Sequence, residues 1–171
     1  MRAGAGKSKG ASFEREVCRR LSLYLSSGRR GDLLWRSAMS GGRATIQFDA
    51  GRVNLTQSGD VTAVGMEAYD FVERTFVEVK HYRDLRIARS IVCGTGDLVA
   101  FWKKTVEESS KYGKRPMLVA RQNLYPTLVV TKSSDDVFGD PVMIVLNHWQ
   151  AHVRLFDEVT KVRIPLQRGA N

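Results

Sequence analysis

The segment TFVEVK at residues 75–80 decides how the chain is expected to fold. Successive side chains of a β-strand point to opposite faces, so Val77 and Val79 would enter a core while Glu78 and Lys80 would lie side by side on the other face. A cleft at that face would place a carboxylate next to an ammonium group. The alternative is a solvated strand face, where a glutamate and a lysine two residues apart are common.

A second acid precedes this strand. Asp60 follows Ser58-Gly59 and begins the strand-like run DVTAV at 60–64, and the glycine indicates a turn or a close backbone approach. If 60–64 and 75–80 pair as a hairpin, Asp60 lies close to Glu78 and Lys80. In the alternative, Asp60 only caps a turn.

A helix is predicted from Ser12, a candidate N-cap, to about Ser26. At 100° per residue its apolar residues share one stripe, formed by Phe13, Val17, Cys18, Leu21, Tyr24 and Leu25. Glu14 falls inside the stripe, whereas Glu16 falls outside it. A carboxylate on the buried side of a helix needs a cation or hydrogen bonds, unless it is simply an acid favoured by the helix macrodipole.

Three acids and Lys80 can therefore converge. Hard cations such as Mg²⁺ prefer carboxylate and water oxygens, and no cysteine or compact histidine cluster competes for a softer metal. Metal-assisted phosphodiester hydrolysis requires this combination of groups. The net charge of +9 favours a polyanionic partner, since neutralising phosphates releases counterions; a basic surface kept for solubility is the alternative.

The length and composition fit one globular domain. No apolar run approaches the roughly 18 to 20 residues that cross a bilayer, and the small, basic start lacks the apolar stretch of a secretion signal. We expect a cytoplasmic protein with no membrane contact and two reduced cysteines, with residues 1–11 as a flexible basic arm and residues 12–171 as a single domain.

Outside the motifs, short strands are expected at 44–48, 52–55, 60–64, 117–121, 127–132 and 142–146. A second helix is expected from Leu98 to Tyr112, and residues 81–97 are expected to be irregular. This order of helices and strands predicts an α/β or α+β domain.

Three segments resemble the PD-(D/E)xK nuclease superfamily: KGASFEREVCRRL at 9–21, SGDV at 58–61 and FVEVK at 76–80. Glu78-Val79-Lys80 matches the (D/E)xK half of the motif and Asp60 its first acid, with Gly59 in place of the proline. Glu14 matches the first-helix glutamate of the Holliday-junction-resolvase branch. The segment WRSAMSGGRAT at 35–45 is similar to phage and prophage nucleases of this class.

The resemblance implies a restriction-endonuclease-like αβββαβ core, a mixed central sheet flanked by helices. Its motifs span 12–122, and 123–171 form a C-terminal extension with extra strands. Asp60, Glu78 and the Val79 carbonyl would hold Mg²⁺, for which Mn²⁺ would substitute, and Glu14 would complete this site or a second one. Lys80 would orient the attacking water or stabilise charge on the phosphate. No small-molecule cofactor is implied.

The implied activity is endonucleolytic cleavage of duplex or branched DNA in a bacterial or phage-infected cell, in recombination or repair and similar to that of a junction resolvase. A homodimer would suit such a substrate. The alternative is a catalytically silent module of the same fold that binds DNA or RNA.

Several residues are candidates for contacts to DNA, because arginine grips phosphate and glycine lets the backbone approach it. They are Arg36, Ser40, Gly41, Gly42 and Arg43, Lys7 and Lys9 in the arm, His81 directly after Lys80, and Arg121 and Gln122. For each basic residue the alternative is a solvent-exposed charge without a partner.

Overall fold

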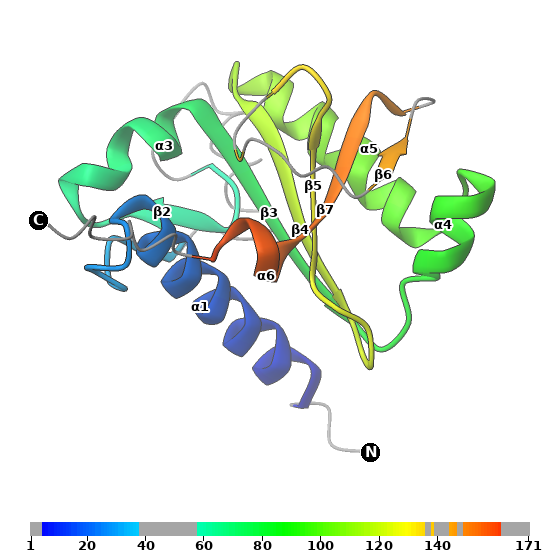
Figure 1. The fold of residues 1–171 in the computed structure, drawn as a ribbon, viewed down its shortest axis with the longest axis horizontal. Coiled ribbons are helices and arrows are strands. Elements are labelled where there is room, and N and C mark those ends of the chain that lie inside the picture. The colour runs from blue at the N-terminus through cyan, green and yellow to red at the C-terminus, as the bar shows by residue number, and fades with distance from the viewer. Residues whose placement is uncertain (1–4, 38–57, 136–137, 139–143, 147–148, 162–171) are drawn as a thin grey trace, which may run out of the picture.

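The computed structural model describes residues 5–37, 58–135, 138, 144–146 and 149–161, with the backbone alone at 5–8 and 144–146. Figure 1 shows these residues as a sheet with helices on both faces. The elements in chain order are α1 (Ala5–Leu25), β1 (Leu34–Arg36), β2 (Val61–Ala63), η2 (Met66–Ala68), α3 (Tyr69–Arg74), β3 (Thr75–Tyr82), α4 (Ile87–Cys93), α5 (Asp97–Lys111), β4 (Arg115–Gln122), β5 (Leu128–Lys132), β6 (Ile144–Leu146), β7 (Ala151–Leu155) and α6 (Phe156–Val159).

The central sheet has five strands in the order β3-β4-β5-β7-β6. Strands β3 and β4 are parallel and are joined through α5, whereas every other neighbouring pair is antiparallel. The sheet is therefore mixed. Counted without the short η2, α3 and α4, the chain runs α1-β1-β2-β3-α5-β4, which confirms the expected αβββαβ order.

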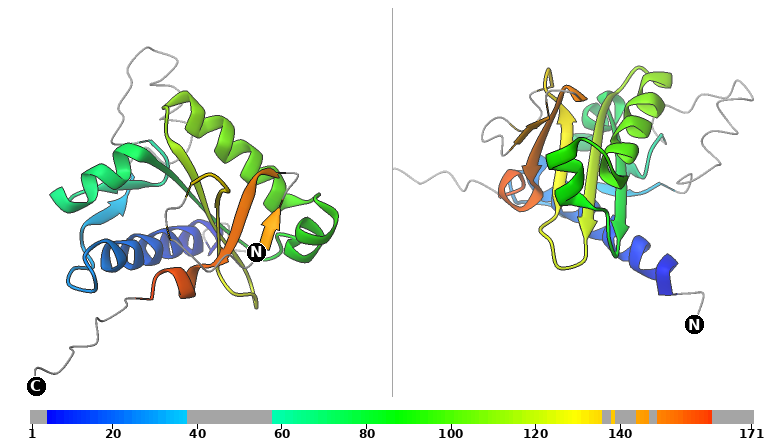
Figure 2. Two further views of the ribbon diagram at one scale, coloured as in Figure 1. Left: turned by 45° about the horizontal axis from the view of Figure 1, so that its top comes forward. Right: turned by 90° about the vertical axis from the view of Figure 1, so that its right-hand side faces the viewer.

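The two faces of the sheet pack against different helices. Val77 and Val79 lie in one buried cluster with residues of α1, such as Val17 and Leu21. Leu118 lies in a second cluster with residues of α5. The left panel of Figure 2 shows the strands of the sheet between α1 and α5. The alternation of apolar residues along β3 and β4 produces both clusters, because each face buries every second side chain.

The expected hairpin between 60–64 and 75–80 was wrong. Strand β2 pairs instead with β1, antiparallel, and places Val61 opposite Arg36. The residues between β2 and β3 form η2 and α3 rather than a tight turn, so the chain leaves β2 without turning straight back onto β3.

The start of α1 also differs from the expectation. The helix begins at Ala5, so Ser12 lies inside it and is not its N-cap, and residues 5–11 of the expected arm are helical. Helix α4 occupies part of 81–97, which were expected to be irregular. It has no side-chain cap at its start, so it lacks the capping residue that indicates the first turn of a helix in a sequence. The strands expected at 44–48 and 52–55 lie outside the described residues.

Residues beyond 122 continue the same sheet and core. Strands β5 and β7 extend the sheet from β4, and Phe156 at the start of α6 is fully buried in the α1-side cluster. The Arg20 guanidinium lies 4.4 Å from the centre of the Phe156 ring. Among the helices that the structure describes, none combines the length and the apolar character needed to cross a membrane.

We predict that Phe156→Ala lowers the free energy of unfolding by about 3–5 kcal/mol, because it leaves a cavity between α1 and the sheet. Urea unfolding followed by circular dichroism measures this change. Val92→Ala, at an exposed position on α4, is the control and should change stability by less than about 0.5 kcal/mol. A cost for Phe156→Ala as small as that of the control would mean that α6 is not part of the folding unit.

Candidate active site

Asp60 lies against the open edge of β3, the edge that does not pair with β4. Its backbone N–H donates to the Val77 carbonyl at 2.8 Å, and the Val79 N–H donates to Asp60 Oδ2, also at 2.8 Å. Gly59 allows this approach: it has φ +83°, and a Cβ there would lie 2.6 Å from the Val77 carbonyl oxygen. A proline, which fixes φ near −65°, could not adopt this conformation. The glycine in the Ser-Gly-Asp sequence is thus a requirement of the site.

Glu78 and Lys80 lie on the face of β3 opposite Val77 and Val79, as predicted. Their side chains are only about one-fifth exposed, and the Lys80 Nζ donates to Glu78 Oε1. The Lys80 Nζ also lies 5.8 Å from the centre of the Phe101 ring on α5. The pair is therefore partly enclosed between β3 and α5, rather than spread on a solvated strand face.

Glu14 approaches the same region from α1. Its Oε2 accepts a hydrogen bond of 2.6 Å from Arg36 Nε, and Arg36 ends β1 directly opposite Val61, the neighbour of Asp60. The Glu14 side chain is 16% exposed and that of Glu16 is 40% exposed. The helical phase expected for these two acids agrees with this difference.

Burial, together with the neighbouring Glu78 carboxylate, raises the pKa of Asp60 to about 7 from its ordinary value of 3.8. Glu14 acts in the same direction, whereas the Lys80 ammonium and the hydrogen bond from Val79 oppose the shift. The Glu78 and Glu14 carboxylates therefore both act on Asp60, and a further positive charge beside Asp60 would stabilise its ionised form.

Lys80 remains a cation in this setting. Burial lowers its pKa, but the carboxylates of Glu78 and Asp60 outweigh burial and raise the pKa above the ordinary value. A lysine that acts as a general base needs a lowered pKa. The environment of Lys80 therefore favours charge stabilisation or hydrogen-bond donation over proton abstraction.

The residues fit a hard divalent cation. Amide and carbonyl of one strand residue point to the same edge, so the Val79 carbonyl faces the edge that Asp60 occupies. With Asp60 and Glu78 this gives two carboxylates and one carbonyl, and Mg²⁺ commonly uses few protein ligands and keeps several waters. Among the residues that the structure describes, no three Asp, Glu, His or Cys side chains are grouped so that they could hold a metal ion. The expected convergence of Glu14 with Asp60 and Glu78 on one ion is therefore not seen, and the role of Glu14 as a metal ligand stays a prediction.

The predicted DNA contacts divide by location. Ser40, Gly41, Gly42 and Arg43 lie outside the described residues, as does the side chain of Lys7. Lys9 and His81 line one hollow together with Lys80, and the His81 ring packs edge-on against Phe13 of α1.

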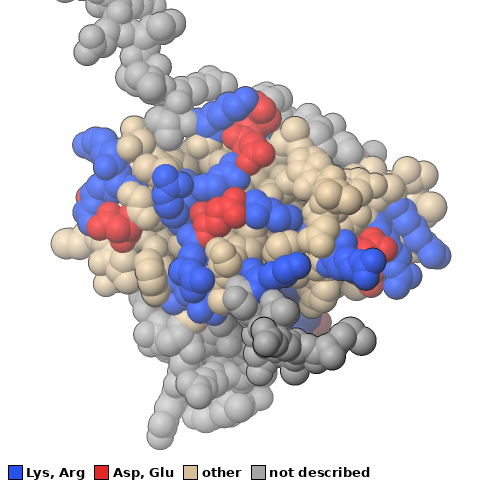
Figure 3. Space-filling model, turned by 90° about the horizontal axis from the view of Figure 1, so that it is seen from below, with Lys and Arg blue, Asp and Glu red and all other residues tan. Residues whose placement is uncertain are grey.

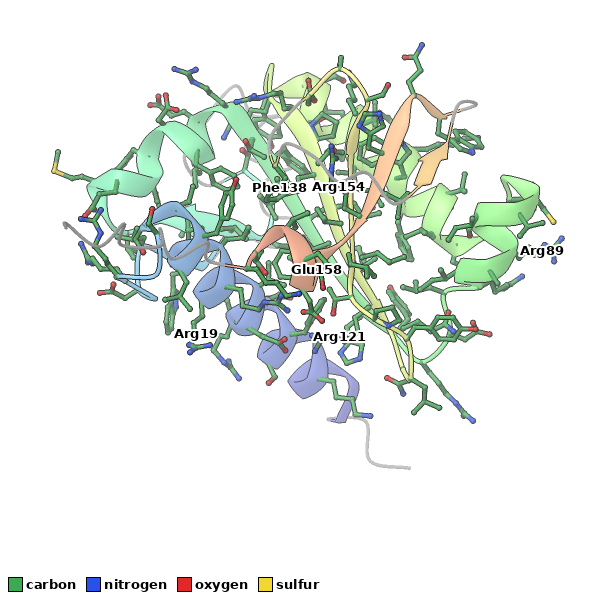
Figure 4. All side chains as sticks on the ribbon, in the orientation of Figure 1. Arg19, Arg89, Arg121, Phe138, Arg154 and Glu158 are labelled. Carbon is green, nitrogen blue, oxygen red and sulfur yellow. The ribbon has the colours of Figure 1, made fainter. Side chains whose placement is uncertain are left out.

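Arg36, Arg121 and Gln122 have partners within the protein. Arg36 binds Glu14, and Arg121 donates two hydrogen bonds, of 2.8 and 2.6 Å, to the Glu16 carboxylate. Figure 4 shows Arg121 at the lower end of the sheet, beside α1. Gln122 Oε1 accepts a hydrogen bond of 2.9 Å from the Leu85 N–H. The contacts of these residues with DNA stay predictions. To bind DNA, each residue would either break its hydrogen bond within the protein or use another atom of its side chain.

Two kinds of feature near the site were not predicted from the sequence. The Glu14–Arg36 and Glu16–Arg121 pairs join residues far apart in the chain, and the second hollow beyond Lys80 is lined by Arg83, Asn123, Leu124 and Tyr125 among others. The sequence around the second hollow carries only a weak signal, because an Asn followed by an apolar residue, as at Asn123-Leu124, does not by itself indicate a turn.

Comparison with known proteins identifies a family. A family model described as phage putative PDDEXK endonuclease matches residues 5–162. No curated protein and no solved structure matches the chain. The family match extends past the resembling motifs at 12–122 to include β5, β7 and α6. The chain belongs to the family of phage putative PDDEXK endonucleases.

Proposed function

We propose that the protein is a divalent-metal-dependent DNA endonuclease that hydrolyses phosphodiester bonds at Asp60, Glu78 and Lys80. The observation that supports it most is the position of Asp60, which is 6% exposed and hydrogen-bonded to the very strand that carries Glu78 and Lys80. A carboxylate of raised pKa beside a second carboxylate and a lysine is costly for folding, and such arrangements concentrate at functional sites.

Asp60, Glu78 and the Val79 carbonyl would hold Mg²⁺ or Mn²⁺, and Glu14 would complete this site or a second one. When bound, the ion would polarise the scissile phosphate and activate water. Lys80, now paired with Glu78, would turn its Nζ to a phosphate oxygen or to the attacking water once Glu78 serves the ion. Arg36 would hold Glu14 in position, or its side chain would leave Glu14 and donate hydrogen bonds to the phosphate instead.

DNA is the proposed substrate because the protein is strongly basic. Figure 3 views the molecule from below the orientation of Figure 1 and shows Lys and Arg over much of the face, with smaller acidic patches among them. We propose a cytoplasmic role in phage recombination or repair, with branched DNA among the substrates and a homodimer presenting two sites to them. The substrate, the location and the oligomeric state are each independent of the catalytic roles of Asp60, Glu78 and Lys80.

We predict that Asp60→Asn and Lys80→Ala each reduce Mg²⁺-dependent DNA cleavage by about 100-fold or more, as loss of a transition-state contact does. Cleavage of labelled linear, single-stranded and four-way-junction DNA, with Mg²⁺ and with EDTA, measures this. Asp70→Asn and Lys104→Ala, at exposed positions, are matched controls and should keep the wild-type rate. DNA binding without cleavage by the wild-type protein would contradict the enzyme and favour a silent binding module.

Two acids of α1 offer an internal comparison. Glu14→Gln should lower the cleavage rate about 10-fold or more, since it removes a carboxylate from the site. Glu16→Gln should change the rate little, because Glu16 pairs with Arg121 instead. The cleavage rates of the two variants, each divided by the wild-type rate at saturating Mg²⁺, show which of the two acids takes part in cleavage. A larger loss in Glu16→Gln would show that the wrong face of α1 has been assigned to catalysis.

Stability in the absence of metal should depend on pH through Asp60. Its folded-state pKa of about 7 exceeds the ordinary 3.8, so the folded state binds the proton more tightly and stability falls as pH rises through this window. Asp60→Asn, which never ionises, should therefore raise Tm in EDTA by several degrees at pH 8 and by little at pH 4.

Thermal unfolding of both proteins at the two pH values, with EDTA and with Mn²⁺, measures the effect. Mn²⁺ should raise the Tm of the wild type at pH 8 more than that of Asp60→Asn, because it stabilises the ionised carboxylate. Asp70→Asn is the control for removal of an acid. An equal Tm for wild type and Asp60→Asn at pH 8 in EDTA would contradict the raised pKa.

A further inference from the structure

The turn that joins β4 to β5 presents an apolar side chain to solvent in an unfavourable backbone conformation. Leu124 is fully exposed, at 104%, and has φ +64°. The Tyr125 N–H donates to the Gln122 carbonyl at 3.1 Å, which closes a β-turn with Leu124 as its third residue. Positive φ in this position favours glycine or asparagine, and a bulky residue there is a rare outlier. The chain thus keeps a leucine where neither packing nor the turn requires one.

Hydrogen bonds fix this turn to the end of β3, the strand that carries Glu78 and Lys80. The Asn123 N–H donates to the Tyr82 carbonyl at 3.2 Å, and His81 Nε2 lies 3.1 Å from Asn123 Oδ1. Figure 1 and the right panel of Figure 2 both show the β4–β5 turn beside the end of β3, at the lower edge of the sheet. The backbone of the turn that carries Leu124 is therefore held in place relative to the strand that carries Lys80.

Two adjoining hollows connect Lys80 with Leu124. Lys80 and Lys9 line the first, Leu124 and Tyr125 line the second, and Arg83 and Asn123 line both. Arg83 has no ion pair with any residue that the structure describes. Among the described residues that line the two hollows, Asp84 is the one acid, and it is outnumbered by the cations Lys9, Lys80, Arg83 and Arg121. A phosphate backbone that leaves Lys80 would pass Arg83 before it reaches the turn.

We propose that Leu124 is a wedge that enters a base step of the DNA next to the bond being cut, while Arg83 contacts the adjacent phosphate and Tyr125 stacks on an unstacked base. This inference rests on the proposed nuclease function and adds a substrate class to it. Apolar side chains that enter base steps must offset the loss of stacking, and this loss is smallest where the stack is already interrupted. DNA with a mismatch, nick or branch point is thus the preferred substrate, ahead of continuous duplex.

Fluorescence of 2-aminopurine tests the wedge directly, because it increases when the base loses its stacking neighbours. The probe is duplex DNA with 2-aminopurine beside a single mismatch, and the same duplex without the mismatch, both with Ca²⁺ in place of Mg²⁺. Wild-type protein should increase the fluorescence and bind the mismatched duplex at least about tenfold more tightly. Leu124→Gly should abolish the increase and reduce the preference to near one.

The variants are chosen so that folding does not confuse the result. Glycine suits φ +64° better than leucine does, so Leu124→Gly should keep or raise Tm. Leu124→Met keeps an apolar side chain and should retain the fluorescence increase. Met66→Ala, which removes another highly exposed apolar side chain that lines neither hollow, should behave as wild type.

The outcomes separate this inference from the proposed function. Metal-dependent cleavage with equal fluorescence for wild type and Leu124→Gly overturns the wedge and leaves the nuclease in place. A fluorescence increase that depends on Leu124, without cleavage in Mg²⁺, supports the entry of Leu124 into the base stack but overturns the nuclease, and with it the position of the wedge beside a cut bond. If the wild-type protein binds neither duplex, both fall.

Discussion

Two hydrogen bonds hold Asp60 against β3, and the candidate site depends on them. The backbone of Asp60 donates to Val77, and its carboxylate accepts from Val79. They place a buried acid at the strand edge beside Val79, whose two neighbours in the strand are Glu78 and Lys80. Gly59 makes the contact possible, since no side chain fits between it and the Val77 carbonyl. The pKa of Asp60 is raised at this position because burial and the neighbouring carboxylates oppose its charge and outweigh the hydrogen bond from Val79.

The sheet and the helices divide the remaining tasks. Strand β3 presents Glu78 and Lys80 to the α5 side while it buries Val77 and Val79 against α1. Helix α1 brings Glu14 to the site and, through Glu16, holds Arg121 at the end of β4. Two of the three acids form an ion pair within the protein, Glu78 with Lys80 and Glu14 with Arg36. These pairs offset part of the repulsion among the carboxylates.

Local periodicity was enough to predict much of this arrangement. The two-residue alternation of TFVEVK predicted which side of β3 each residue faces, and the 100° helical step distinguished Glu14 from Glu16. The proximity of Asp60 to Glu78 was predicted from a hairpin that does not exist. The contact is instead made by two hydrogen bonds, from Asp60 to Val77 and from Val79 to Asp60. The Glu16–Arg121 pair spans 105 residues, and α4 begins without a capping side chain, so neither has a local signal. The strained Leu124 turn depends on its anchoring to β3, which sequence does not show.

Anomalous diffraction from a crystal soaked in Mn²⁺ tests the central claim most directly, because it locates the ion without reference to activity. The account predicts an anomalous peak within about 2.0 to 2.6 Å of an Asp60 oxygen, of a Glu78 oxygen and of the Val79 carbonyl, with the Lys80 amine moved off Glu78. A peak elsewhere on the protein, or no peak at this edge of β3 while Lys80 stays bound to Glu78, would contradict it.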